Sequence, residues 1–343
     1  MRPKKITIDD IARATGFSRA TVSVALSDRV DLRIAGDTRE TVRALAAKLG
    51  YTFASSGRAS RAGRTALLFL YEDIGSSHVG TSFFVRVAEE LKRIGSERGF
   101  IVLEASAAGM DSISLRRLIA DFKIAACIVY ADVAAKAARA AAPSLPLLFL
   151  QADGREEMEV AASYLVDDIA IGNVAAQTLL DSGKRNAFMI FPHNLDHRCQ
   201  KERIEGFKSV FQKAGGRCSL IALSSFDGQG VALEIETALE RLGAGGESLA
   251  GFDAAYFFSD ALALIGLRVF AKAGFRIPED IAVIGTDNLY WGAFSKPSLS
   301  TMELHEHLFA EKIADDVAAA LQGRAWHGFA TRIPIAAIMR EST

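Results

Sequence analysis

The sequence TIDDIARATGFSRATVSVALS spans residues 7–27 and contains two short helical patterns separated by a tight turn. Thr7 is placed to cap the first helix, and Gly16 is placed to end it. Ser18 is placed to cap a second helix from Arg19 to about Ser27. Because so few residues join these helices, they must cross steeply, which is the arrangement of a helix-turn-helix.

A third helix is predicted over Thr38–Leu49, where apolar residues recur at helical spacing. Residues 54–64 read ASSGRASRAGR, a stretch without a large apolar side chain, and are predicted to form a linker. The chain therefore divides into a helical headpiece at 1–53, the linker, and a large remainder at 65–343.

The remainder alternates short, continuous apolar runs with amphipathic helical patterns. Such runs are typical of strands buried on both faces of a parallel sheet. The predicted strands are 66–71, 100–103, 125–130, 146–150, 188–191, 220–223, 254–258 and 281–284, and the predicted helices are 83–98, 112–122, 171–182, 203–214, 231–242 and 262–273. Two such series predict two lobes with doubly wound parallel sheets, and a ligand cleft where the strands end.

Charge is distributed unevenly along the chain. Residues 1–64 contain 13 Lys and Arg against 6 Asp and Glu, a balance of +7. Because the whole chain has a net charge of -1, the remaining 279 residues carry -8. This asymmetry predicts a polyanionic partner for the headpiece alone, but it does not distinguish DNA, RNA and anionic lipid.

Several classes of protein are disfavoured by the sequence. No apolar run is long enough for a membrane span, and no apolar segment follows the basic start, so a cytoplasmic location is expected. The three cysteines, Cys127, Cys199 and Cys218, are scattered, which fits a reducing compartment.

No motif for catalysis or for a cofactor is present. The sequence contains no G-x-S-x-G, no phosphate-binding loop and no constellation of paired carboxylates, so neither an enzyme nor a cofactor is predicted. His193, His197 and Cys199 have a spacing that could bind a metal ion. They lie in the loop before Arg203, however, and lining of the ligand cleft or simple exposure to solvent is preferred over a metal site.

Residues 7–27 closely resemble the headpiece of lactose-repressor (LacI/GalR) family regulators. The matching elements are DIA at 10–12, GFS at 16–18, TVS at 21–23, TRE at 38–40, LGY at 49–51, RIEGF at 203–207, FSDALAL at 258–264, IPEDIAVIGTD at 277–287 and LST at 299–301. The resemblance implies a small all-α helix-turn-helix headpiece followed by an α/β two-lobed, periplasmic-binding-protein-like domain. The first lobe would comprise about 65–164 and 299–324, and the second about 165–296 and 327–340.

The same resemblance implies a sequence-specific DNA-binding transcriptional regulator, and in particular a repressor. It would bind a pseudo-palindromic operator in double-stranded DNA as a homodimer. A small polar effector, a sugar or sugar derivative, would bind between the lobes and either release or promote DNA binding. The alternatives are a solute-binding protein, against which the basic headpiece counts, and a sugar-processing enzyme.

The second helix is expected to enter the major groove. Arg19, Ala20 and Val24 stand where the family reads bases: the arginine can fork onto guanine, and the other two can contact thymine methyl groups. Phosphate contacts are expected from Thr7, Ser18, Thr21 and Ser23. A solvated or phosphate-bound side chain is the alternative for Arg19.

Two departures from the family pattern affect the expected operator. Val24 stands where the family usually has arginine, and the linker lacks the leucine that many members insert into the minor groove. Arg58, Arg61 and Arg64 lie in that region instead, and arginine can enter a narrow minor groove without unstacking bases. A less kinked operator is therefore expected, unless the linker never folds.

Effector-binding residues are expected at the ends of strands. Arg203 and Asp287 can each hold vicinal hydroxyls or a charged group through paired hydrogen bonds. The other candidates are Ser259, Asp260, Gln151 for a neutral polar ligand, and Phe83 as a stacking aromatic. Helix capping or an ion pair is the alternative for the acidic residues, and core packing is the alternative for Phe83.

Overall fold

The computed structural model describes residues 8–26, 36–48, 65–71, 82–108, 110–130, 132–151, 161–192, 198–225, 227–244, 251–326 and 330–343. Contacts between Cα atoms divide the chain into two compact units, Met1–Arg64 and Thr65–Thr343.

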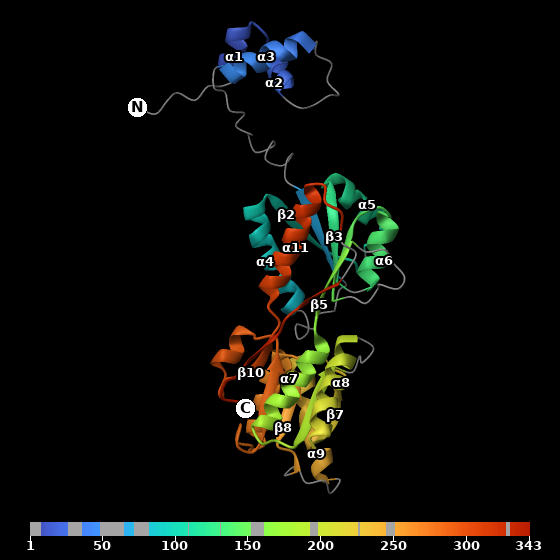
Figure 1. Cartoon of the computed structure of the whole chain (residues 1–343), viewed down its shortest axis with the longest axis vertical. Coiled ribbons are helices and arrows are strands. Elements are labelled where there is room, and N and C mark those ends of the chain that lie inside the picture. The colour runs from blue at the N-terminus through green and yellow to red at the C-terminus, as the bar shows by residue number, and fades with distance from the viewer. Residues whose placement is uncertain are drawn as a thin grey trace, which may run out of the picture. The chain divides into compact units, whose positions relative to one another are not determined.

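The first unit contains three helices, α1 (Ile8–Thr15), α2 (Arg19–Leu26) and α3 (Gly36–Lys48) (Figure 1). Gly16 ends α1 as predicted: its φ is +75°, and its N–H donates to the Ala12 carbonyl at 3.0 Å. The three helices enclose a small core formed by Ile11, Val22, Ala25, Val42 and Ala46. The two predicted short helices therefore form and pack on the third.

The second unit begins with a six-stranded sheet. Its strands are β1 (Thr65–Tyr71), β2 (Phe100–Ser106), β3 (Ile124–Tyr130), β4 (Leu147–Leu150), β5 (Ala162–Val166) and β11 (Ala330–Ile333), in the order β11-β5-β4-β3-β1-β2. All neighbouring strands are parallel. The helices of this lobe pack in pairs, α4 (Ser82–Arg98) with α11 (Glu306–Leu321), and α5 (Ser112–Asp121) with α6 (Asp132–Ala141).

A second six-stranded sheet forms the other lobe. Its strands are β6 (Asn186–Pro192), β7 (Arg217–Leu223), β8 (Ala254–Phe257), β9 (Ala282–Thr286), β10 (Ser300–Glu303) and β12 (Ala336–Ile338), in the order β12-β10-β9-β8-β6-β7. Only the β10–β12 pair is antiparallel among the pairs described. Helices α7 (Asp168–Asp181) and α8 (Arg198–Lys213) pack together, as do α9 (Gly228–Ala244) and α10 (Asp260–Lys272).

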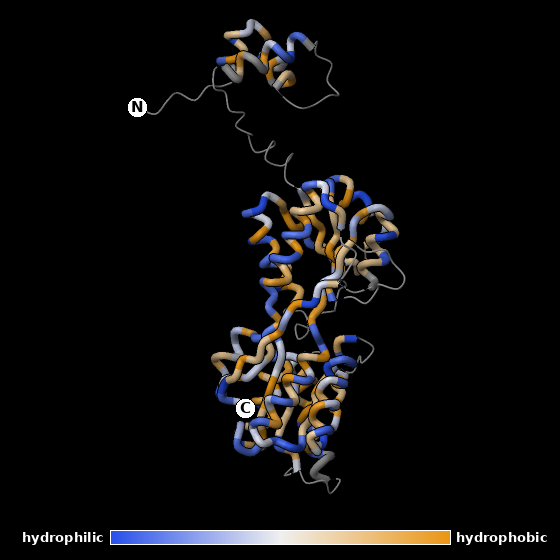
Figure 2. The backbone as a smooth tube through the Cα atoms, viewed as in Figure 1, coloured by the Kyte–Doolittle hydropathy of each residue, from blue (hydrophilic) through white to orange (hydrophobic). Residues whose placement is uncertain are grey.

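The apolar runs of the sequence become the central strands. All four residues of β4, all four of β8 and all five of β9 are buried, because helices cover both faces of each sheet. Figure 2 shows apolar segments running through the interior of both lobes and polar ones at many outer turns. The predicted architecture of two doubly wound, parallel-dominated sheets behind a helix-turn-helix unit is confirmed.

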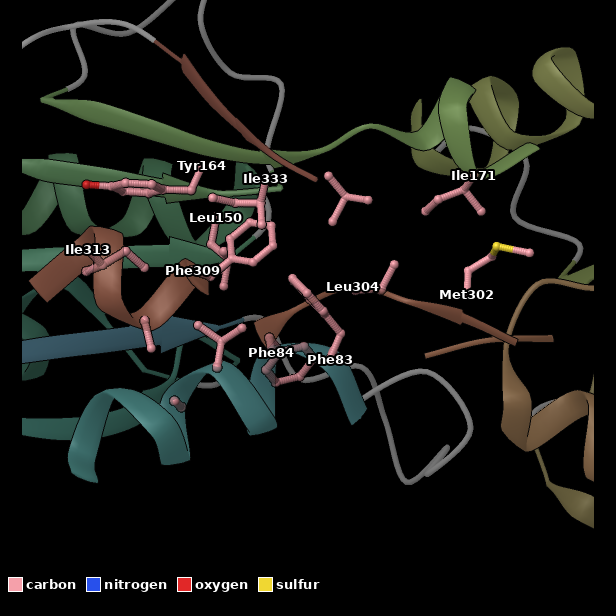
Figure 3. Close-up of a cluster of buried hydrophobic side chains, with 14 of the residues drawn as sticks. Phe83, Phe84, Leu150, Tyr164, Ile171, Met302, Leu304, Phe309, Ile313 and Ile333 are labelled. Atoms are coloured by element: carbon pink, nitrogen blue, oxygen red, sulfur yellow. The ribbon is translucent and has the colours of Figure 1, made fainter. Parts of the chain in front are cut away.

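The chain crosses between the lobes three times, and these crossings correct the expected lobe bounds. Strand β10 pairs with β9 and so belongs to the second sheet, whereas the sequence places residues from 299 onward in the first lobe. Strand β11 pairs with β5 and so belongs to the first sheet, whereas residues from 327 onward are expected in the second. Figure 3 shows the apolar cluster beside these crossings, where Phe83, Leu304 and Phe309 lie close together.

Candidate functional site

The start of α2 is the exposed part of the helix-turn-helix. The Ser18 hydroxyl accepts a hydrogen bond from the Thr21 N–H at 3.1 Å and lies 2.8 Å from the Thr21 hydroxyl, which confirms the predicted cap. Ser18 and Arg19 are exposed, whereas Val22 and Ala25 are buried. The positive end of the helix dipole and two hydroxyls therefore lie at an accessible surface, a combination suited to phosphate binding.

The predicted DNA-contacting residues fall into two groups. Arg19, Ala20, Thr21, Ser23 and Val24 all lie within α2, and Ser18 caps it. Thr7, Arg58 and Arg61 lie outside the described residues, so the proposed phosphate and minor-groove contacts of these three remain predictions.

In the second unit, the Arg203 side chain is buried, and it donates hydrogen bonds to two protein acceptors. Helix α8 begins earlier than expected, at Arg198, so Arg203 lies in its second turn rather than at its start. The Arg203 Nε donates to the Asp168 carboxylate at 2.8 Å, and Nη1 donates to the Phe258 carbonyl at 3.0 Å. The Phe258 ring lies 4.5 Å from the guanidinium carbon, a cation–π distance.

Two glycines explain how α8 brings Arg203 to Asp168. A Cβ at Gly172 of α7 would lie 2.2 Å from the Arg203 carbonyl oxygen, and a Cβ at Gly206 would lie 2.3 Å from the Ile169 carbonyl oxygen. Only glycine therefore allows the two helix backbones to approach this closely. Asp168, the first residue of α7, was not anticipated from the sequence, although it follows a buried strand in the way the predicted cleft residues do.

Asp287 follows β9 directly and is connected to both lobes. It adopts a φ of 113°, and its N–H donates to the Met302 carbonyl at 2.8 Å. Its carbonyl accepts a hydrogen bond from Nη2 of Arg86, on α4 of the first lobe, at 2.5 Å. The same nitrogen contacts the carboxylate of Glu306, the first residue of α11. Arg86 therefore links the two lobes, and no signal in the sequence identified it.

Asp260 is fully buried and its carboxylate is used within the protein. Its oxygens accept hydrogen bonds from the Thr301 hydroxyl at 2.6 Å and from the Leu289 N–H at 2.8 Å. Burial, together with the nearby charge of Asp287, raises the pKa of Asp260 to about 8. Ser259 caps α10 by accepting from the Leu262 N–H at 3.4 Å. These contacts favour a structural role for both residues over a direct effector contact.

The two remaining effector candidates also make internal contacts. The side-chain oxygen of Gln151 accepts a hydrogen bond from the Val166 N–H at 2.8 Å. The Phe83 ring is buried edge-on against Phe309, with ring centroids 5.1 Å apart, which favours the core-packing alternative. The neighbouring Phe84 stacks on Tyr130 at 4.6 Å instead.

Tyr130, at the carboxyl end of β3, lies near charged residues of the second lobe. Burial raises the pKa of its hydroxyl, and Cys199, Arg203, Asp168 and Asp287 all lie close enough to influence it. An aromatic surface from the first lobe thus lies near the Arg203–Asp168 pair of the second. Tyr130 and Phe84 were missed because their role depends on pairing between strands and helices distant in sequence.

Two hollows lie outside the Arg203–Asp168 pair. One, of about 810 Å³, lies between α9 and α10, and another, of about 500 Å³, lies beside Arg86, Trp291 and Arg340. Neither hollow is lined by Arg203 or Asp168. The candidate effector site is therefore identified by its convergent polar groups and not by the volume of a hollow.

Other kinds of site find little support in the part of the chain that is described. Within it, no three His, Cys, Asp or Glu side chains are grouped as metal ligands would be. His193 and His197 lie outside the described residues. Within the same residues, no helix is long and apolar enough to cross a membrane.

Both units match known protein families. Residues 7–52 match the model for bacterial regulatory proteins of the lacI family, and residues 176–343 match that for a periplasmic binding protein-like domain. The regulator DegA of Bacillus subtilis is 24% identical over 307 residues, which cover 87% of this chain and 86% of DegA. The ribose operon repressor of Haemophilus influenzae is 24% identical, with 86% of each chain covered.

Solved structures share the fold over nearly the whole length. The lac repressor dimer bound to operator and the anti-inducer ONPF has a TM-score of 0.69 at 18% identity, covering 99% of both chains. The regulator CelR in complex with cellobiose has a TM-score of 0.67 at 22% identity, covering 99% of this chain and 100% of CelR. The family matches show that the chain joins a headpiece of the lacI family of bacterial regulatory proteins to a periplasmic binding protein-like domain, and the solved structures show the same fold.

Proposed function

We propose that the protein is a cytoplasmic transcriptional repressor that binds operator DNA as a homodimer and is controlled by a small polar effector. The observation that carries the proposal is the exposed, Ser18-capped start of α2 in a chain that also has a two-lobed effector fold. A homodimer presents two such helices about a two-fold axis, which requires a pseudo-palindromic site.

The effector is a sugar or sugar derivative bound around Arg203 and Asp287. Vicinal hydroxyls suit a guanidinium and a carboxylate, because each can form paired hydrogen bonds with them. The aromatic rings of Phe84 and Tyr130 can cover the apolar face of such a ligand. A structural relative was solved with cellobiose, which supports a carbohydrate ligand for this fold.

The operator is expected to differ from those of typical relatives. Val24 replaces the family arginine in α2, and Arg58 and Arg61 replace a wedging leucine in the linker. Hydroxyl-radical footprinting of the bound operator tests the linker contacts. Protection of the central minor groove supports them, and unprotected central base pairs contradict them.

Selection of operators from a random DNA library by the full chain tests the proposed function. A pseudo-palindromic consensus should emerge, and Arg19→Ala should relax it. Carbohydrates that raise the melting temperature would then be added to the operator complex, where they should change its affinity. Recovery of sequences without a consensus, or turnover of a bound sugar, would contradict the proposal.

A further inference from the structure

The Arg203–Asp168 ion pair lies at the centre of the proposed effector site, and the inference below rests on that proposed function. The exposed fractions of the two side chains are 5% and 6%, and their closest atoms are 2.8 Å apart. The Phe258 carbonyl also accepts a hydrogen bond from the guanidinium. The positive charge of Arg203 is therefore compensated before any ligand enters.

The surrounding charged groups do not restore a positive potential. Asp260 and Asp287 are close enough that the charge of one raises the pKa of the other's carboxyl group. Arg86, which also contacts the backbone of Asp287, is paired with Glu306. Nη2 of Arg86 thus already has two protein acceptors, whereas its buried Nε has no hydrogen-bond partner among the described residues.

Gln200 has a buried, unpartnered oxygen on the same helix as Arg203. It lies one turn before Arg203 on α8 and is only 4% exposed. Its side-chain oxygen has no hydrogen-bond partner in the part of the chain that is described. A buried carbonyl oxygen requires a donor, which a hydroxyl group supplies and an ionised carboxylate does not.

We propose that Asp168 is a specificity-determining residue that neutralises Arg203 and restricts the site to uncharged, hydroxyl-bearing effectors. A hydroxyl can bind beside the ion pair without separating it. A carboxylate or phosphate ligand must either displace Asp168 or remain next to it, and either arrangement leaves a buried charge uncompensated. Asp168 therefore excludes sugar acids and sugar phosphates.

The test uses the full chain and inorganic phosphate as the probe. Asp168→Asn should expose the charge of Arg203, and it should bind phosphate about tenfold or more tightly than the original chain. Binding is measured by calorimetry and by the melting temperature, with sodium chloride at equal ionic strength as the salt control.

Asp167→Asn is the matched control, because it removes the same charge one residue earlier. Asp167 caps α7 by accepting from the Ala170 N–H, and asparagine caps a helix equally well. This variant should gain no phosphate affinity. Equal gains in both variants, no gain in Asp168→Asn, or equally tight binding by the original chain would overturn the proposal.

If Asp168→Asn does not fold, the original chain provides a second test. Glucose 6-phosphate and gluconate are compared with neutral sugars, including glucose and cellobiose, for their effect on the melting temperature. Stabilisation by either anion overturns the proposal, and stabilisation confined to neutral sugars supports it. No DNA is present in these measurements, so their failure is distinguishable from a failure of operator selection.

Discussion

Arg19 is the side chain at the start of α2 that has the strongest capacity to distinguish bases. It is exposed beside the Ser18 cap, where a guanidinium can reach the edge of guanine. Arg19→Ala should cost about 1–3 kcal/mol of operator binding and relax the preference at one base pair. Fluorescence anisotropy with the operator and with its single-base variants measures both effects. An equal loss on operator and random DNA would instead identify a phosphate contact.

Asp260 should make stability depend on pH. Its pKa is raised in the folded protein to about 8, whereas an unfolded aspartate titrates near 4. The folded protein therefore retains a proton that the unfolded chain releases, and the free energy of unfolding should fall as pH rises from about 4 to 8. The slope is at most about 1.4 kcal/mol per pH unit.

Chemical denaturation of the original chain and of Asp260→Asn at several pH values tests this dependence. The variant loses one acceptor oxygen and is expected to be less stable overall, but its stability should vary less across this window. If the free energy of unfolding changes with pH equally in both proteins, a group other than Asp260 causes the dependence.

At the residue scale, the sequence singled out Ser18 and Asp287 because they stand at a helix cap and a strand end, and Arg203 because it lies in the RIEGF segment that resembles the family. It did not reveal which partner each side chain takes. Asp168 becomes the partner of Arg203 only because α7 and α8 pack closely, and Asp260 becomes internal because β10 brings Thr301 against it. Partner choice depends on tertiary packing, which a local pattern does not encode.

The close approach of α7 and α8 positions the Arg203–Asp168 pair, and Gly206→Ala tests this at the scale of elements. The added methyl group would meet the Ile169 carbonyl oxygen at 2.3 Å, so α8 must move away from α7. Overpacking of this kind costs about 1–3 kcal/mol of unfolding free energy. Weaker effector binding should accompany it, because Arg203 moves with the helix.

Gly251→Ala is the matched control, since a Cβ at Gly251 would meet no heavy atom within 4 Å. The free energy of unfolding of this variant, measured with denaturant, should be close to that of the original chain. A Gly206→Ala protein that is equally stable would show that the helices can separate at little cost.

The sequence predicted the strands that are buried along their whole length, but it assigned two later segments to the wrong lobe. Strands β1, β3, β6 and β8 coincide with apolar runs that are buried on both faces. Strands β10 and β11 have four residues each, and their lobes were exchanged in the prediction. β10 and β11 each lie directly before a crossing between the lobes, and the position of a crossing depends on the sheet topology rather than on the residues of one strand.

At the scale of the whole effector-binding unit, three crossings connect the lobes, and Arg86 adds a side-chain link between them. It joins α4 of the first lobe to the Asp287 carbonyl of the second and to Glu306 at the start of α11. If an effector binds at Asp287 as proposed, this arginine would transmit the binding to the first lobe, since allosteric control requires a difference in contacts between states.

A double-mutant cycle with Arg86→Met and Glu306→Gln measures the strength of the ion pair that holds this arginine in place within the first lobe. Burial raises the pKa of Glu306 while Arg86 opposes that rise, so removing the arginine leaves a largely buried carboxylate without its cation. Arg86→Met should therefore lower the free energy of unfolding more in the original chain than in a chain that already has Glu306→Gln. The expected coupling energy is about 1–3 kcal/mol, obtained from denaturant unfolding. Additive effects would show that Glu306 contributes nothing to holding Arg86 beside the Asp287 carbonyl.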